Sequence, residues 1–181
     1  MDIEVFSRHP MVRTQVFHFG PERGFVAVEL VVEGIKLTFV AIHAYPRQWR
    51  GAEGFRLRTL TLEGLGEKAA SLSHPLLVMG DFNASTWSPA YKTMVKKSSL
   101  RNAQQGFGLV VTHHGHDAVS RWLWRPIDHC LQTADVKVNR FWTGPDLGSD
   151  HLPILVECIL PRVTTQANSE SFGPATSSSR K

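Results

Sequence analysis

A short, wholly apolar segment, Leu76 to Met79, places the strongest constraint on how this chain folds. Pro75 precedes the segment and Gly80 follows it, so it is bounded too closely for a helix and predicts a short strand. A strand with one face in solvent alternates apolar and polar side chains, whereas a strand covered on both faces is apolar throughout. We therefore expect a sheet with other layers packed on both of its faces.

The segments around this strand predict a strand-rich fold. Two runs rich in valine, isoleucine and phenylalanine, residues 25–32 and 35–43, flank Glu33-Gly34 and predict a hairpin with a two-residue turn. Further strands are expected in five short runs: 3–5, 16–19, 122–131, 136–142 and 152–160.

Two segments predict helices. Apolar residues at helical spacing predict a helix over 55–72. Ser88 followed by Pro89 is typical of a helix start and predicts a second helix over 88–97. Together with the strands, this order indicates an α/β protein in which sheets pack face to face and helices cover them.

The length of 181 residues suits one domain with a substantial hydrophobic core, which we place at residues 1–160. From Pro161 onward the composition changes to serine, threonine, glutamine and asparagine, which cannot bury enough apolar surface to become ordered. Residues 161–181 are therefore predicted to form a disordered tail. We expect the chain to be a monomer.

Composition argues against several classes of protein. The apolar runs are far shorter than the ~20 residues of a transmembrane helix, and acidic residues rather than a basic and apolar leader follow Met1. The two cysteines, Cys130 and Cys158, lie in apolar runs and suit reduced thiols better than a disulfide framework. We expect no membrane segment in this chain and a cytoplasmic location by default, unless residues before Met1 carry an anchor.

The charge of the chain gives little information about its partners. The net charge is +4, and half of it lies in the residues after Leu160. The excess that remains in the body of the chain is too small to indicate nucleic acid by itself.

Polar residues stand at the ends of four apolar segments. His43 ends the run 35–43, and Gly80-Asp81-Phe82-Asn83 follows the buried strand. Asp128 lies in the predicted strand 122–131, and Ser149-Asp150-His151-Leu152-Pro153 precedes the last strand. Each of these residues alone would suit an ordinary turn or cap, but the four segments in this order carry more information.

These four segments closely resemble the endonuclease/exonuclease/phosphatase family, which includes deoxyribonuclease I, exonuclease III-type endonucleases, neutral sphingomyelinases and inositol polyphosphate 5-phosphatases. The resemblance covers residues 3 to 160 and is most specific at the GDFN and SDHLP segments. It implies a DNase I-like four-layer α/β sandwich. It also implies hydrolysis of a phosphate ester with a divalent metal ion, Mg²⁺ or Mn²⁺.

The resemblance implies a role for each polar residue. Asp81 is similar to the carboxylate that orients or activates water, and Asn83 to a donor that contacts the phosphate. Asp128 and His151 resemble a carboxylate–histidine pair beside the scissile phosphate, and His43 the histidine opposite that pair. Asp150 resembles a metal ligand, with Asp81 and Asn83 as further candidate ligands. These residue types suit the reaction, because carboxylates hold hard cations and a neighbouring carboxylate favours a charged imidazole.

One part of the family pattern is missing. Family members open with a strand ending in Asn and a second strand ending in Gln-Glu, whose Glu is the principal metal ligand. The first residues here resemble the strand that follows, and Glu4 lacks the preceding Gln, so it receives no role. We expect a fold without its first strands, with weak metal binding and an unpaired sheet edge, whether the chain is a fragment or a genuine short form.

The predicted function is therefore metal-dependent hydrolysis of a phosphodiester or phosphomonoester, with nucleic acid among the substrates to consider. The alternative is a non-catalytic remnant that keeps the cleft as a binding module. A third reading makes the enzyme zinc-dependent through His43 and the loop with His113, His114, His116 and Asp117, although a polar loop is the favoured interpretation of that segment. Among the tryptophans, Trp87 is the candidate for a substrate contact.

Overall fold

The computed structural model describes residues 3–46, 51–113 and 124–162. The elements in these ranges are, in order, β1 (Met11–His18), β2 (Gly24–Val32), β3 (Ile35–His43), α1 (Ala52–Ala69), β4 (Leu76–Asp81), α2 (Pro89–Ser98), β5 (Arg101–Asn102), β6 (Asp128–Gln132), β7 (Lys137–Thr143) and β8 (Ile154–Ile159). Apart from its first two residues, the predicted tail lies outside the described ranges.

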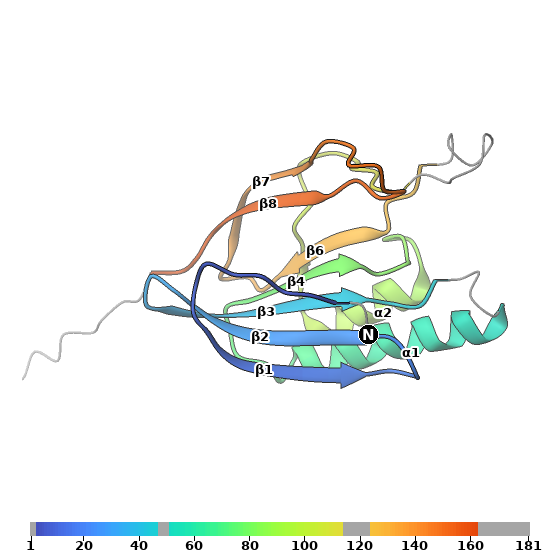
Figure 1. Ribbon diagram of the computed structural model, residues 1–181, viewed down its shortest axis with the longest axis horizontal. Coiled ribbons are helices and arrows are strands. Elements are labelled where there is room, and N and C mark those ends of the chain that lie inside the picture. The colour runs from blue at the N-terminus through green and yellow to red at the C-terminus, as the bar shows by residue number, and fades with distance from the viewer. Residues whose placement is uncertain (1–2, 47–50, 114–123, 163–181) are drawn as a thin grey trace, which may run out of the picture.

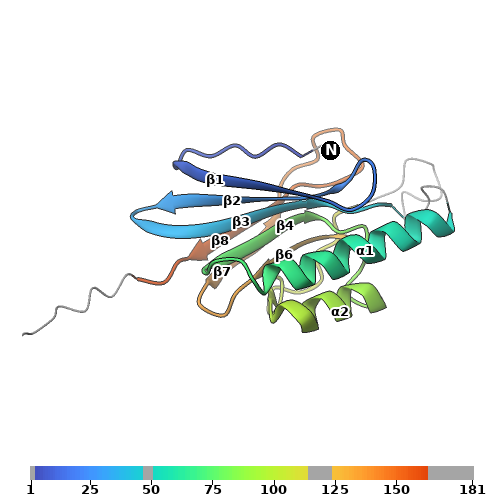
Figure 2. The same cartoon turned by 90° about the horizontal axis from the view of Figure 1, so that it is seen from below.

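The strands form two sheets. One sheet has the order β1-β2-β3-β4-β6-β5, and β7 pairs with β8 in the other. Figure 1 shows the β7–β8 pair on one face of the six-stranded sheet, and Figure 2 shows α1 and α2 side by side on the opposite face. The described residues thus build three layers of the expected four-layer sandwich, and within these ranges no helix covers the outer face of β7–β8.

β4 is the doubly covered strand that the apolar run predicts. It pairs parallel with β3 and antiparallel with β6. Leu76 and Val78 are fully buried on the helix side, whereas Leu77 and Met79 pack on the side of β7–β8. Packing on both faces explains why a polar side chain would be costly anywhere in this run.

The predicted hairpin is confirmed. Val32 of β2 pairs with Ile35 of β3 across the two-residue turn. Glu33 and Gly34 both have positive φ angles, 50° and 81°, which match the twist of the flanking strands.

Both predicted helices are present. α1 begins and ends three residues earlier than the pattern predicts. α2 begins at Pro89, where the Ser88 hydroxyl accepts a 3.2 Å hydrogen bond from the Tyr91 amide, as expected of an N-cap. Neither helix in the described ranges is long and apolar enough to cross a lipid bilayer.

The predicted strand at 3–5 is not formed. These residues belong to an extended segment that has no partner strand among the described residues. Val5 nevertheless packs on the sheet against a cluster that contains Val28 and Leu30, while the neighbouring Phe6 is exposed. The segment is therefore held by side-chain packing rather than by a hydrogen-bonded ladder.

The predicted strand at 122–131 is shorter than expected. It begins at Asp128, and residues 122 and 123 lie outside the described ranges. Pro126 has no amide hydrogen to donate to a neighbouring strand, so regular pairing starts after it.

Gly80 allows β3 and β4 to remain paired where the polar segment begins. A Cβ atom at this position would overlap the carbonyl oxygen of Ile42 in β3. Gly80 also has a φ of 141°, which residues with a side chain rarely adopt. The glycine of the GDFN segment is thus a requirement of the backbone.

We predict that Gly80→Ala lowers the free energy of unfolding by about 3 kcal/mol or more, because steric overlap adds to backbone strain. The matched control is Gly34→Ala, which also has positive φ but has no atom within 4 Å of the added carbon. It should cost only about 1–2 kcal/mol. Urea denaturation of both variants measures the difference, and equal losses would contradict the proposed overlap.

Candidate functional site

Strand register brings three of the predicted site residues together. His43 at the end of β3 pairs with Asp81 at the end of β4, and Asp81 pairs with Asp128 at the start of β6. Paired residues on neighbouring strands carry their side chains on the same face of a sheet. Here that face is the one shared with Met79 and Cys130, which pack toward β7–β8. The three side chains therefore meet at one end of the space between the sheets.

The GDFN segment forms a turn that fixes Asp81 and Asn83 together. The Asp81 carboxylate accepts 2.7 Å hydrogen bonds from both the backbone amide and the side-chain amide of Asn83. The Asn83 side chain also donates to the Ala44 carbonyl at 3.0 Å, so both of its amide hydrogens are used within the protein. Its side-chain oxygen is the atom left for a ligand, and donation to a phosphate would require one of these bonds to break.

The structure also explains why the turn contains phenylalanine at position 82 and asparagine at position 83. Phe82 is fully buried in the core on the helix side. Asn83 has a φ of 48°, a left-handed conformation that asparagine tolerates better than most residues. The Arg58 guanidinium donates a 2.7 Å hydrogen bond to the Asn83 carbonyl, which links the turn to α1.

Asp128 and His151 form a direct pair. Nδ1 of His151 lies 2.8 Å from Oδ2 of Asp128. The Thr112 hydroxyl donates to the same carboxylate oxygen at 2.5 Å, which fixes the orientation of Asp128. The backbone amide of His151 donates to Ser149 at 3.1 Å. The imidazole is thus oriented through Nδ1, and its Nε2 atom is not engaged by Asp128.

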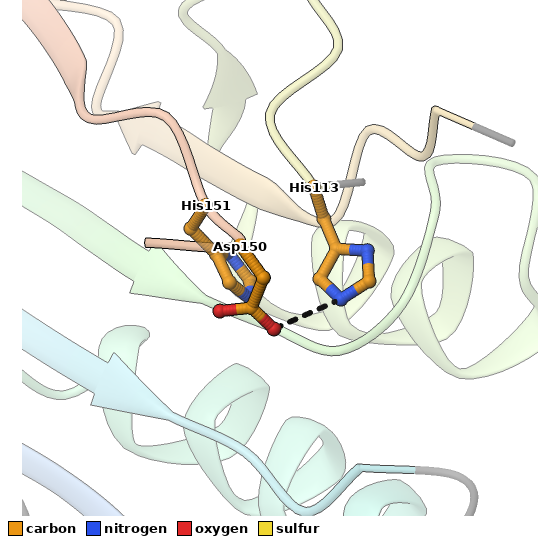
Figure 3. A group of neighbouring side chains, drawn as sticks. All are labelled: His113, Asp150 and His151. Carbon is orange, nitrogen blue, oxygen red and sulfur yellow. Dashed lines mark ion pairs between the residues drawn. The ribbon is translucent and has the colours of Figure 1, made fainter. Parts of the chain in front are cut away.

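Asp150 lies beside His113, which the sequence analysis favoured as part of a polar loop. Nε2 of His113 is 3.6 Å from Oδ2 of Asp150, and the His113 ring meets the His151 ring edge to face with centroids 4.6 Å apart (Figure 3). His113 is 9% exposed. It therefore belongs to the site and not to a solvated polar loop; His114, His116 and Asp117 lie outside the described residues.

All six predicted site residues line one cleft of about 570 Å³: His43, Asp81, Asn83, Asp128, Asp150 and His151. The same cleft is lined by His113, Arg23 and Glu4, which the sequence analysis did not place among the six site residues. Arg23 follows Gly20-Pro21 in a turn between strands, and no local pattern distinguishes it from a solvated arginine. His113 could have been found, since it ends the apolar run Val110-Val111 much as His43 ends its strand.

The cleft shifts the pKa values of its acids and imidazoles. Burial, together with the neighbouring Asp128 charge, raises the pKa of Asp81 to about 7. The hydrogen bond to Asp128 raises the pKa of His151, whereas burial and the nearby His151 and Arg125 lower the pKa of His113. Nε2 of His43 lies 3.8 Å from Oδ2 of Asp81, so a third imidazole borders these carboxylates.

Two groups of donor atoms could each hold a metal ion. Asp81, Asp128 and His151 form one group, and His113, Asp150 and His151 form the other, with all donors of a group within 4.8 Å of one another. His151 belongs to both. Asp81 and Asp150, which the sequence analysis assigned to a single metal site, fall into different groups.

A second pocket of about 380 Å³ adjoins the cleft and shares Asn83 and His113 with it. Trp87, Trp124 and Arg125 line this side pocket. The two tryptophans are 62% and 43% exposed, which is unusual for such large apolar side chains. The side pocket thus offers flat apolar surfaces next to the Arg125 guanidinium, beside the cleft that holds the six site residues.

Comparison with known proteins matches this chain to one family. The sequence model of the Endonuclease/Exonuclease/phosphatase family matches residues 4–151. UPF0294 protein YE0917 of Yersinia enterocolitica is 30% identical over 157 residues, which are 83% of this chain and 51% of that protein. The chain thus spans about half the length of this curated relative.

Solved structures of low sequence identity share the fold. The mannosyl-6-phosphatase Bt3783 of Bacteroides thetaiotaomicron superimposes with a TM-score of 0.65 at 19% identity, over 83% of this chain and 67% of that one. A variant of beta toxin from Staphylococcus aureus with bound magnesium ions gives a TM-score of 0.56 at 14% identity, over 86% and 66%. These likenesses confirm the DNase I-like fold that the resemblance implied.

We predict that Asp128→Asn lowers the pKa of His151, because the amide removes the hydrogen-bonded charge that stabilises the imidazolium. In the wild type the raised pKa means that this pair stabilises the fold fully below about pH 6.5 and loses that contribution as the pH rises through the folded-state pKa. NMR titration of the imidazole in the presence of a chelator measures the change. The control is Asp135→Asn, which replaces an exposed acid on another loop; the same pKa in wild type and Asp128→Asn would refute the assigned cause.

Proposed function

Because the chain belongs to the endonuclease/exonuclease/phosphatase family, we propose that it is a divalent-metal-dependent phosphoesterase that hydrolyses a phosphodiester or phosphomonoester. The observation that carries the proposal is the meeting of Asp81, Asp128 and His151, from three distant segments, with donor atoms within 4.8 Å of one another. Two carboxylates and an imidazole in one cleft can activate water and contact a phosphoryl group.

The donor atoms of the cleft suit a hard divalent cation. Mg²⁺ and Mn²⁺ prefer carboxylate and amide oxygens. We assign the ion to Asp81 and the side-chain oxygen of Asn83, with Asp150 as a ligand through water, because Asp81 and Asp150 belong to different groups of donor atoms. When bound, it would neutralise phosphoryl charge and make a bound water more acidic. The magnesium ions in the similar beta toxin structure support this choice of metal class.

Asp81 and His151 carry the proton transfers in this proposal. A carboxylate with a pKa of about 7 can accept a proton near neutral pH. Asp81 therefore orients the attacking water and takes its proton, while its two hydrogen bonds from Asn83 fix its position. His151, charged because of Asp128, donates to a phosphate oxygen or to the departing oxygen. His43 acts from the opposite side as a phosphate contact or general acid.

Arg23 provides the cation that the sequence analysis did not assign. It lines the cleft, and its Nη1 atom is buried without a hydrogen-bond partner among the described residues. A buried guanidinium hydrogen atom without an acceptor is costly in the free protein. A phosphate oxygen would satisfy it, so we assign Arg23 to binding the phosphoryl group.

The side pocket gives the proposal a place for the rest of the substrate. Trp87 and Trp124 offer flat surfaces to a ring, such as a sugar or a nucleobase, and Arg125 offers a charge. Sugar phosphates and nucleic acids both contain such rings. The similarity in fold to the mannosyl-6-phosphatase Bt3783 favours testing a sugar phosphate first.

The alternative is that this chain keeps the cleft as a binding module without turnover. No segment of the chain resembles the strand that ends in the metal-binding Glu of the family. Glu4 lines the cleft, but on an extended segment rather than at the end of a strand. Metal-dependent turnover by the chain itself distinguishes the two functions.

We predict that the chain hydrolyses bis-p-nitrophenyl phosphate or p-nitrophenyl phosphate with Mg²⁺ or Mn²⁺ and loses this activity when EDTA is added. Asp81→Ala and His151→Ala should each reduce kcat by a factor of about 100 or more, because each removes a group that moves a proton. The release of p-nitrophenolate measures the rate, and circular dichroism checks that the variants fold.

Matched controls are Asp135→Ala and His74→Ala, which remove exposed residues of the same types outside the cleft. Both should keep wild-type rates. Wild-type turnover in either site variant would refute the assigned roles. A folded chain that binds the metal but has no activity with either substrate would favour the binding module.

We predict that Arg23→Gln lowers kcat/KM by a factor of about 10–100, because a charged hydrogen bond contributes about 1.5–3 kcal/mol. Arg23→Lys should restore part of the loss, since it keeps the charge but not the fork-like geometry. Arg101→Gln, on the exposed side of β5, is the control and should behave as wild type. Equal activity of Arg23→Gln and wild type would exclude Arg23 from phosphate binding.

A further inference from the structure

The group of His113, Asp150 and His151 differs in chemistry from the oxygen donors assigned to magnesium. It offers two imidazoles and one carboxylate, whose donor atoms lie within 4.8 Å of one another. Figure 3 shows the His113 ring and the Asp150 carboxylate facing each other, with His151 beside them. Imidazole nitrogen is a preferred ligand of zinc and cobalt, and magnesium strongly prefers oxygen.

We propose that His113, Asp150 and His151 form a site for a transition-metal ion of the zinc class, with one coordination position open to the cleft. Two histidines and one carboxylate are a ligand set that zinc accepts when it keeps a position for water or substrate. The site shares Asp150 and His151 with the proposed hydrolytic machinery, so an ion bound there excludes the proton-donating form of His151. Metal binding there does not require the chain to be a hydrolase.

The spacing of the donors supports this assignment. Ligands about 2.0–2.1 Å from a tetrahedral zinc ion lie roughly 3.3 Å from one another. The separation of 3.6 Å between His113 Nε2 and Asp150 Oδ2 is close to that value. A small movement of either side chain would bring both atoms to bonding distance from one ion.

The backbone holds the three ligands together without help from the metal. His113 forms isolated β-bridges with Arg125 on one side and with His151 on the other. The His113 amide donates to the Arg125 carbonyl at 3.1 Å, and the Arg125 amide donates back at 2.8 Å. The Leu152 amide donates to the Thr112 carbonyl at 2.6 Å. The ligands are therefore placed by main-chain pairing, which reduces the conformational entropy that binding must remove.

The residues behind His151 also fit a metal site. Nδ1 of His151 is bonded to Asp128, which leaves Nε2 for the ion. Asp128 is itself held by the Thr112 hydroxyl. A carboxylate that accepts from the second nitrogen of a histidine ligand is the common arrangement behind protein-bound zinc, since it fixes the tautomer and makes the nitrogen a better ligand.

The test begins with the full chain, from which metal is removed by EDTA and the EDTA then by dialysis. Co²⁺ is titrated into this protein, and its visible d–d absorption measures binding. Zn²⁺ is then added to displace the Co²⁺. We expect one intense, four- or five-coordinate Co²⁺ signal in the wild type. His113→Asn and Asp150→Asn should each weaken Co²⁺ binding at least tenfold. His74→Asn, an exposed histidine outside the cleft, should leave it unchanged.

A double variant, His114→Asn with His116→Asn, separates this site from the histidines that follow His113 in the sequence. Binding that survives in the double variant and is lost in His113→Asn supports the proposal. Binding that survives in His113→Asn, or that is lost only in the double variant, overturns it, as does the absence of Co²⁺ binding to the folded wild type. None of these binding measurements depends on hydrolytic activity. The result would therefore stand even if the chain proved not to be a phosphoesterase.

Discussion

The pairing register of β3, β4 and β6 is the constraint on which the rest of this site depends. It sets His43, Asp81 and Asp128 in one row across three strands, all facing the β7–β8 layer. Gly80 maintains that register, because its missing side chain lets the β3 carbonyl approach closely just before the row begins. Phe82, which is fully buried in the core on the helix side of the sheet, anchors the turn that follows β4.

The electrostatics of the cleft follow from that row. Two buried carboxylates stand on neighbouring strands, and their mutual repulsion together with burial favours a proton on Asp81. His151 balances the charge of Asp128, and Arg23 adds a fixed positive charge at the edge of the cleft. In the proposed function, a dianionic phosphate and a divalent cation would enter this arrangement as a nearly neutral pair.

Much of this organisation could be predicted from local sequence. The hairpin, the doubly buried β4 and the capped α2 follow from turn chemistry, an unbroken apolar run and Ser88-Pro89. The six polar residues were found through a family resemblance, and strand register explains why three of them, His43, Asp81 and Asp128, meet. Arg23 was missed because its importance depends on partners far along the chain, whereas His113 was assigned to a polar loop although an apolar run precedes it. The strand expected at 3–5 was wrong, since β-forming residues need a neighbouring strand that the described residues do not supply.

The position of His43, Asp81 and Asp128 at the ends of paired strands has a consequence for how this chain can change during evolution. Side chains alternate between the two faces of a sheet, so deleting or inserting one residue within β4 would turn Asp81 toward the helices and Leu76 or Val78 away from them. Such a change would remove the active groups and the core contacts in one step. Length variation should therefore be tolerated in the connections between strands, where new specificities can arise, and be absent from the strands that carry the row.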